Sequence, residues 1–214
     1  MCTQNAHGLW RRATDSDGKH LRNQPRDTTR FEHLIATMAS KELDMYFVQE
    51  TWIEGNDFDM EIRGYHVFRH NGTLGSNLHC DVAIILSPRY YEGWKAAGGK
   101  SPVTLPQEDK FVGRFIGLTI KLNCRNSRGQ KINGGRRKRD SLEISLISAY
   151  HPCHTEDEHS RFLDRMDGLL RKLPPSEIVI GVDINADIGT SSKRDDTYVP
   201  TPVSYTHLTL PTKA

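Results

Sequence analysis

The stretch Glu177-Ile-Val-Ile-Gly-Val-Asp-Ile-Asn-Ala-Asp-Ile-Gly189 joins a short apolar run to a polar turn. The apolar run is short, rich in β-branched residues and bounded by turn residues, so we predict a buried strand over 177–183. Asp183 and Asn185 alternate at its end, and their side chains should therefore point the same way. Loops held at the ends of strands are where active-site groups tend to converge. This stretch therefore predicts a sheet with functional side chains at one end.

Three further polar clusters lie at or just beyond the ends of predicted strands, at 4–9, 49–52 and 148–152. The second cluster contains Glu50, which directly follows an apolar run over 43–49 that we interpret as a buried strand. A lone carboxylate in such a place is costly unless a metal ion or another partner compensates it.

The remaining elements are predicted from the spacing of apolar residues. One helix begins after Thr28 or Thr29, either of which can cap it, and has an apolar face over 31–38. A second amphipathic helix covers 156–172 and stops at the prolines 174–175. Further strands are predicted at 65–70, 81–87, 111–122 and 142–150. This mixture indicates an α/β or α+β domain with helices covering the faces of a sheet.

Composition limits the class of protein. The chain has 214 residues and a net charge of +2, which suits one globular domain and does not by itself indicate a nucleic-acid partner. No apolar run is long enough to span a membrane, and we expect no membrane association. The four cysteines are far apart and show no CxxC pairing, so we interpret them as reduced thiols of an intracellular protein.

The polar clusters contain the groups that a metal-dependent phosphodiesterase needs. Such an enzyme uses carboxylate oxygens for a hard divalent cation, a base for water, and donors for the phosphorus centre. The clusters read, in order, Asn-x-x-Gly-Leu from Asn5, Gln-Glu-Thr around Glu50, Ala-Tyr-x-Pro around Tyr150, and Gly-x-Asp-x-Asn-Ala around Asp183. This ordered set resembles the endonuclease/exonuclease/phosphatase superfamily, and most of all the apurinic-endonuclease-type domain of LINE-type retrotransposons.

The resemblance implies a four-layer αββα sandwich and dependence on Mg²⁺ or Mn²⁺. Asn5 resembles the first-motif asparagine beside the metal, and Glu50 the metal-binding glutamate. Tyr150 resembles the tyrosine that contacts the scissile phosphate. Asp183 resembles the aspartate that orients or deprotonates the attacking water, and Asn185 the asparagine that stabilises the transition state.

The sequence departs from the family pattern at both ends. The family ends in a serine-aspartate-histidine motif, and nothing after Gly189 matches it. We therefore expect a fragment, residues 1–190, whose activity is impaired by a factor on the order of 10²–10⁴ or lost. Only four residues precede Asn5, which predicts a clipped first strand. Residues 202–214 resemble translated sequencing-adapter sequence, and residues 191–214 are predicted to be an unstructured, non-native tail.

The same residues could also have purely structural roles. Glu50 could be a salt-bridge partner at a strand end, and Asp183 with Asn185 could merely shape a turn. Tyr150 could be an interior tyrosine whose hydroxyl bonds to the backbone. We expect His151 to be a surface or turn residue and not a metal ligand.

A basic run lies in the turn of the long hairpin predicted from the strands 111–122 and 142–150; its residues are Arg136, Arg137, Lys138 and Arg139. It could be a solvated loop, a nuclear-localisation signal, or a contact to nucleic-acid phosphates.

The first functional hypothesis is a DNA endonuclease domain of a retroelement, a monomer acting inside the cell, in the nucleus if the basic run is a localisation signal. Its nick would supply the primer end for a reverse transcriptase domain elsewhere in the parent protein. The second is a phosphatase or lipid phosphodiesterase of the same superfamily. The third is a catalytically inert fragment.

Overall fold

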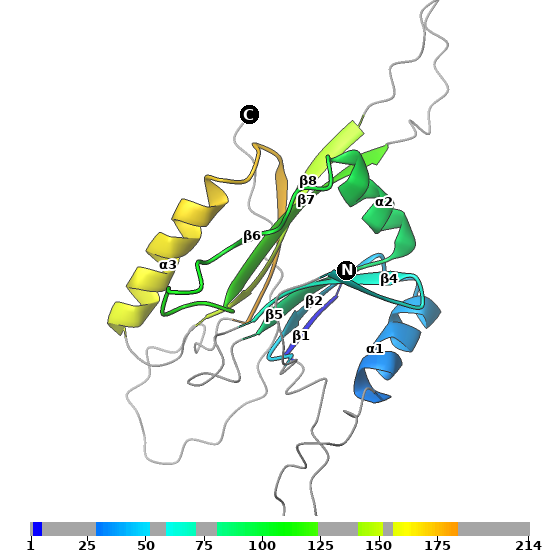
Figure 1. Cartoon of the computed structure of the whole chain (residues 1–214), viewed down its shortest axis with the longest axis horizontal. Helices are drawn as coiled ribbons and strands as arrows, with labels where there is room; N and C mark the ends of the chain where they lie inside the picture. The colour runs from blue at the N-terminus through cyan, green and yellow to red at the C-terminus, as the bar shows by residue number, and fades with distance from the viewer. Residues whose placement is uncertain are drawn as a thin grey trace, which may run out of the picture.

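The computed structural model describes residues 2–5, 29–51, 59–71, 81–123, 141–151 and 156–183. They form two β-sheets and three helices (Figure 1). The helices are α1 (Thr29–Ser40), α2 (Pro88–Ala96) and α3 (Glu156–Leu170). The strands are β1 (Cys2–Asn5), β2 (Met45–Gln49), β3 (Asp59–Ile62), β4 (Tyr65–His70), β5 (Val82–Leu86), β6 (Val103–Thr104), β7 (Phe115–Asn123), β8 (Ser141–Tyr150) and β9 (Glu177–Asp183).

The first sheet has the strand order β1-β2-β5-β4-β3. β1 runs parallel to β2, and the other neighbours are antiparallel. α1 covers the outer face of this sheet, because its buried residues at helical spacing pack on the alternate residues of β2, β4 and β5. The apolar residues predicted over 31–38 thus form the contact between helix and sheet.

The second sheet has the order β6-β7-β8-β9. β7 and β8 form a long antiparallel pair, and β9 lies parallel to β8. α3 covers the outer face through Phe162 and Leu169, which pack against Phe115 and Ile147 of the sheet. The parallel pairing brings the ends of β8 and β9 to the same edge of the sheet, where Tyr150 is the register partner of Asp183.

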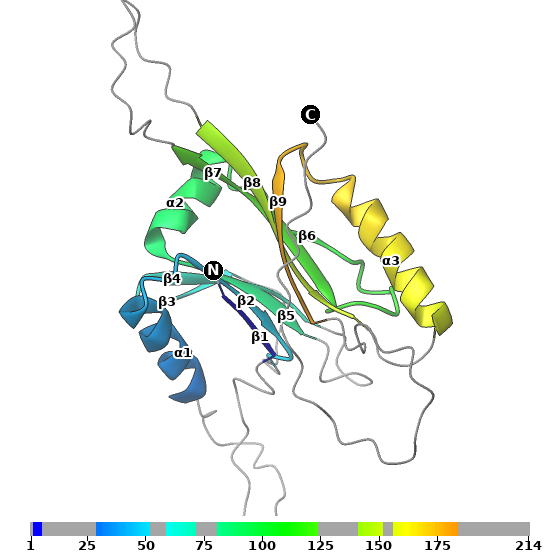
Figure 2. The same ribbon diagram turned by 180° about the vertical axis from the view of Figure 1, so that it is seen from behind.

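The inner faces of the two sheets pack against each other around an apolar core that includes Phe47, Ile84, Ile116 and Leu146. Figure 1 shows α1 and α3 on opposite sides, with the two sheets between them, and Figure 2 shows the same layers from behind, with β9 beside β8. The four-layer αββα sandwich implied by the resemblance is therefore confirmed for the described residues.

β1 is a short strand of four residues, in agreement with the predicted clipped first strand. Other details differ from the sequence-based predictions. The predicted strand over 111–122 begins only at Phe115, because residues 111–114 form turns. α2 was not predicted, although Ser87 caps it and Pro88 opens it, which is a common helix start. In the described part of the chain, no helix is long and apolar enough to cross a membrane.

Candidate active site

Glu50, Tyr150 and Asp183 meet at one end of the sandwich. Tyr150 and Asp183 end the neighbouring parallel strands β8 and β9, and the backbone N–H of His151 donates to the Asp183 carbonyl over 2.8 Å. The Tyr150 hydroxyl donates a hydrogen bond to Glu50 Oε1, which connects the second sheet to the first. Their exposed fractions are 8% for Glu50, 9% for Tyr150 and 8% for Asp183, so all three polar groups are buried.

The backbone of Glu50 has an unusual conformation. Its φ is +54°, in the left-handed region that residues other than glycine rarely adopt. Glu50 directly follows β2, and with this backbone its carboxylate reaches Tyr150 on the inner side of the sandwich. A left-handed L-residue costs about 1–2 kcal/mol, and such strain tends to occur at functional sites. Burial of the carboxylate and strain of the backbone thus occur together at the predicted metal ligand.

Gln49, the residue before Glu50, connects the two sheets. Its Nε2 donates to Ser148 Oγ over 3.1 Å and to the Gly181 carbonyl over 3.3 Å. Ser148 Oγ in turn donates to the Val48 carbonyl over 3.3 Å. Gln49 and Ser148 are fully buried, and each residue of this network lies within two positions of Glu50, Tyr150 or Asp183. The sequence motif contained Gln49, but we assigned it no role.

Gly181 allows β9 to approach the first sheet closely. A Cβ at this position would lie 2.4 Å from Cβ and Cγ of Phe47, which is closer than real contacts allow. Glycine is therefore required here by the packing of the two sheets. Because Asp183 lies two residues further along the same strand and on the same side, this close approach also sets how near Asp183 comes to the first sheet.

Arg114 lies beside Tyr150 and was not predicted as a site residue. It directly precedes β7, and its carbonyl accepts a hydrogen bond from the Tyr150 backbone N–H over 2.9 Å. Its Cζ lies 4.9 Å from the centroid of the Tyr150 ring, a cation–π contact, and its exposed fraction is 7%. The sequence signal that could have found it is an arginine in phase with the apolar positions Ile116 and Leu118.

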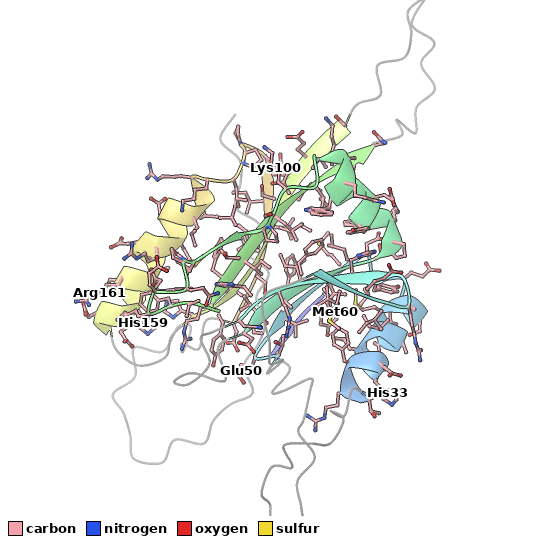
Figure 3. All side chains as sticks on the ribbon, in the orientation of Figure 1. His33, Glu50, Met60, Lys100, His159 and Arg161 are labelled. Carbon is pink, nitrogen blue, oxygen red and sulfur yellow. The ribbon has the colours of Figure 1, made fainter. Side chains whose placement is uncertain are left out.

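His151 is buried, and our expectation of a surface residue was wrong. Its exposed fraction is 5%, and its ring lies 4.2 Å from that of His159 and 5.2 Å from that of Phe162 in α3. The apolar face of α3 therefore closes over the residue that follows Tyr150. Figure 3 shows Glu50 and His159 toward the same end of the molecule.

A second group of buried polar residues lies at the same end of the first sheet. Asp81 precedes β5, and His70 and Asn71 end β4, with exposed fractions of 5%, 1% and 7%. The register pairs Val82 with both Gln49 and His70, so these residues border the strand end that carries Glu50. The signal for His70 and Asn71 was polar residues at the end of a predicted strand, and the signal for Asp81 was a carboxylate directly before an apolar strand.

The other predicted site residues are only partly described. The backbone of Asn5 ends β1 and is the register partner of Gln49, so it lies at the same sheet edge as Glu50. Asn185 and the basic run Arg136–Arg139 lie outside the described residues. β7 ends at Asn123 and β8 begins at Ser141, and these two residues pair at the opposite end of β8 from Tyr150.

The donor set suits a hard divalent cation. Glu50 and Asp183 supply carboxylate oxygens, which Mg²⁺ and Mn²⁺ prefer, and Mg²⁺ binds through one or two carboxylates while keeping several waters. Among the described residues no group of three or more histidine, cysteine, aspartate or glutamate side chains converges, so a site built only from protein ligands is not formed there. Glu50 and Asp183 are thus the described carboxylates of this site that could hold such an ion.

No protein-family model matches the sequence, and no curated protein matches it significantly. Among solved structures, the chain is similar to the endonuclease domain of TRAS1, a telomere-specific non-LTR retrotransposon, with 18% identity, a TM-score of 0.42, and coverage of 73% of this chain and 53% of that one. It is similar to an endonuclease/exonuclease/phosphatase family protein from Leptotrichia buccalis C-1013-b, with 16% identity, a TM-score of 0.45, and coverage of 87% and 66%.

A third similar structure is the human Nocturnin catalytic domain, with 10% identity, a TM-score of 0.38, and coverage of 84% of this chain and 64% of that one. The chain thus spans between 53% and 66% of the length of these three proteins. At these identities and TM-scores, neither a family, a substrate nor an activity of this chain follows from the likeness.

Proposed function

We propose that this chain carries a large part of a divalent-metal-dependent phosphodiesterase domain of the endonuclease/exonuclease/phosphatase superfamily, and that its substrate is DNA. The observation that supports this most is the convergence of Glu50, Tyr150 and Asp183, buried, at the ends of strands from two sheets. Tyr150 and Asp183 lie 100 or more positions after Glu50 in the sequence, yet all three residues meet there. Each of the three comes from a different polar motif.

Each residue has a role that follows from its chemistry. Glu50 would hold the divalent cation, and a bound cation would supply neutralisation of the charge on the phosphate. Asp183 accepts the proton of the attacking water as the water oxygen forms a bond to phosphorus. The Tyr150 hydroxyl has a single proton, which it gives to Glu50 in this structure and would turn to a non-bridging oxygen of the bound phosphate. The bond between phosphorus and the leaving oxygen then breaks, and solvent protonates that oxygen.

The DNA substrate and the retroelement origin rest on the motif resemblance, which is closest to LINE-type endonuclease domains. In such an element the nick would provide a primer end for reverse transcription, and the target would be chromosomal, which requires entry into the nucleus. Asn5 and Asn185 are proposed to contact the metal site and the transition state, as their positions in the motifs imply.

The test is hydrolysis by the 214-residue chain and its variants in Mg²⁺, in Mn²⁺ and in EDTA. Supercoiled plasmid reports nicking, and bis(p-nitrophenyl) phosphate, a phosphatidylinositol phosphate and p-nitrophenyl phosphate report other phosphate esters. The variants are Glu50→Gln and Asp183→Asn, which keep side-chain size and remove a charge. Glu143→Gln is the matched control, because Glu143 is 44% exposed and pairs with Lys121 at the far end of β8.

Metal-dependent nicking that Glu50→Gln and Asp183→Asn abolish and Glu143→Gln retains would support the proposal. Hydrolysis of the phosphoinositide or the monoester alone, with the same dependence on Glu50, would instead support a phosphatase or lipid phosphodiesterase. Activity that survives both active-site substitutions would show that another site or a contaminant is responsible. A folded chain that hydrolyses none of these substrates would be catalytically inert.

A further inference from the structure

Arg114 lies on the inner side of the second sheet, directly before β7 and beside Tyr150. It precedes Ile116 and Leu118, which alternate along β7 and belong to the core between the sheets. Arg114 therefore continues the same face toward the strand end at which Tyr150 lies. Its guanidinium covers one face of the Tyr150 ring, with Cζ 4.9 Å from the centroid.

The charge of Arg114 is buried and only partly compensated. The guanidinium stays protonated in proteins, and 7% of the residue is exposed. Its Nη1 is buried and makes no hydrogen bond to any residue in the described part of the chain. A cation–π contact offsets only part of the cost of burying a charge, and a buried arginine ordinarily has a carboxylate or another acceptor. A buried donor without an acceptor, directly beside a polar cluster, indicates a place for an anionic ligand.

The surroundings favour a phosphate as this anion. Glu50 and Asp183 place two carboxylates at the same strand ends, and this local negative charge repels a phosphodiester. A fixed cation beside them reduces the repulsion. Guanidinium donors also form a planar fork that matches two oxygens of a phosphate, and a lysine ammonium does not.

We propose that Arg114 binds a non-bridging oxygen of the substrate phosphodiester next to the Tyr150 hydroxyl, and that it does so without the metal ion. The inference rests on the proposed function, since it assigns a substrate contact to the same site. It assigns Arg114 two tasks, because the guanidinium that binds phosphate also keeps the Tyr150 ring in place. Arg114 is then a substrate-binding residue, and the affinity of the site for phosphate does not depend on Glu50 alone.

The experiment measures binding apart from catalysis. The anisotropy of a short fluorescein-labelled DNA duplex is titrated with the 214-residue chain in EDTA, at several salt concentrations, for the parent chain and for Arg114→Gln and Arg114→Lys. Arg89→Gln is the control, because it removes an equal charge from a side chain that is 75% exposed on α2. Circular dichroism and thermal unfolding of each variant report whether it folds.

We expect Arg114→Gln to bind about 10- to 100-fold more weakly, as the loss of a hydrogen bond to a charged group predicts. The slope of log affinity against log salt should become shallower by about 0.9, the value for one phosphate contact. Arg114→Lys should keep the slope and lose part of the affinity, because the charge remains and the fork does not. Arg89→Gln should change affinity by less than Arg114→Gln.

Equal affinity and equal slope in the parent chain and a folded Arg114→Gln variant would overturn the inference, whatever the enzyme assays give. If Arg114→Gln does not fold, the DNA affinity of Arg114→Lys is the test, and an affinity equal to that of the parent chain overturns the inference. Weaker binding by Arg114→Gln together with no hydrolysis by the parent chain in Mg²⁺ would uphold the phosphate contact and reject the proposed function. Hydrolysis with unchanged kcat and KM in Arg114→Gln would uphold the proposed function and reject the phosphate contact of Arg114.

Discussion

Gln49 of β2 donates a hydrogen bond from Nε2 to Ser148 Oγ of β8 over 3.1 Å, across the interior between the two sheets. The same nitrogen reaches the Gly181 carbonyl of β9 at 3.3 Å, so one amide connects three strands. Each of these strands carries a candidate active-site residue one or two positions further along. The network therefore sets the distance between the sheets at the place where Glu50, Tyr150 and Asp183 meet.

Gln49→Leu is expected to lower both stability and activity. The substitution leaves a buried hydroxyl and a buried carbonyl without their donor, which costs about 1–3 kcal/mol in the free energy of unfolding. We also expect kcat to fall by about tenfold or more, because a shift near 1 Å is enough to misplace catalytic groups. Urea unfolding measures the loss of stability, and the rate of phosphodiester hydrolysis measures the loss of activity. Both are measured at a temperature well below the midpoint of thermal unfolding.

Gln107→Leu is the matched control for Gln49→Leu, because Gln107 is exposed and the same change should cost less stability there than at the buried Gln49. A Gln49→Leu variant as stable and as active as the parent chain would show that the network does not position the site.

Binding of Mg²⁺ should depend on the Glu50 carboxylate. A ligand that binds only the folded state raises its stability, so Mg²⁺ or Mn²⁺ should raise the melting temperature of the parent chain. Glu50→Gln keeps the hydrogen-bond acceptor for Tyr150 and removes the charge, and this shift should disappear. Differential scanning fluorimetry over a range of metal concentrations measures it, with Glu143→Gln as control. An equal shift in Glu50→Gln would place the metal elsewhere.

Because the backbone at Glu50 is strained, we expect glycine there to give a more stable chain than alanine, which is the reverse of the usual order. At ordinary positions alanine is more stabilising than glycine, because glycine loses more conformational freedom on folding. At a φ of +54° the order should reverse, and Glu50→Gly should exceed Glu50→Ala in stability by about 1 kcal/mol. Chemical denaturation of the pair decides this, and Glu143→Gly against Glu143→Ala gives the ordinary order as reference. If Glu50→Ala is instead more stable than Glu50→Gly, the backbone at Glu50 is not strained.

Much of this fold could be predicted from the sequence, because its central strands and two of its helices bury strongly patterned apolar residues. The alternation in β7 and β8 and the helical spacing in α1 and α3 show directly which faces are covered. α2 and β3 were missed. α2 has an apolar face made largely of aromatic residues such as Tyr91 and Trp94, and β3 is a four-residue strand paired on one side only, so neither has a long periodic pattern.

The site was predictable in part, for a different reason. Glu50, Tyr150 and Asp183 follow strands in recognisable motifs, so a chemical argument could place them at strand ends. Arg114 carries no motif, and its importance depends on a ring contributed by β8, which no local pattern reveals. The burial of His151 likewise depends on α3 folding back over the strand end. Residues whose role comes from a distant partner become visible only in the folded chain.

Gly181 of β9 and Phe47 of β2 are in close contact between the two sheets. Gly181→Ala places a methyl group where Phe47 already lies, at 2.4 Å, and overpacking of this kind costs about 1–3 kcal/mol. Because the added methyl pushes β9 away from the first sheet, hydrolysis should fall more than the loss of stability alone explains. Thermal unfolding and hydrolysis rates give the two quantities.

Two variants make this prediction specific. Gly168→Ala in α3 meets no atom within 4 Å and should stabilise the chain slightly, because alanine favours helix. Gly181→Ala combined with Phe47→Ala should cost less stability than the two single substitutions added together, because Phe47→Ala removes the Cγ that the new methyl group meets at 2.4 Å and leaves only the contact with Cβ. If the double variant is instead as unstable as the sum of the two single variants, the sites do not couple. The contact would then not be what holds Asp183 close to the first sheet.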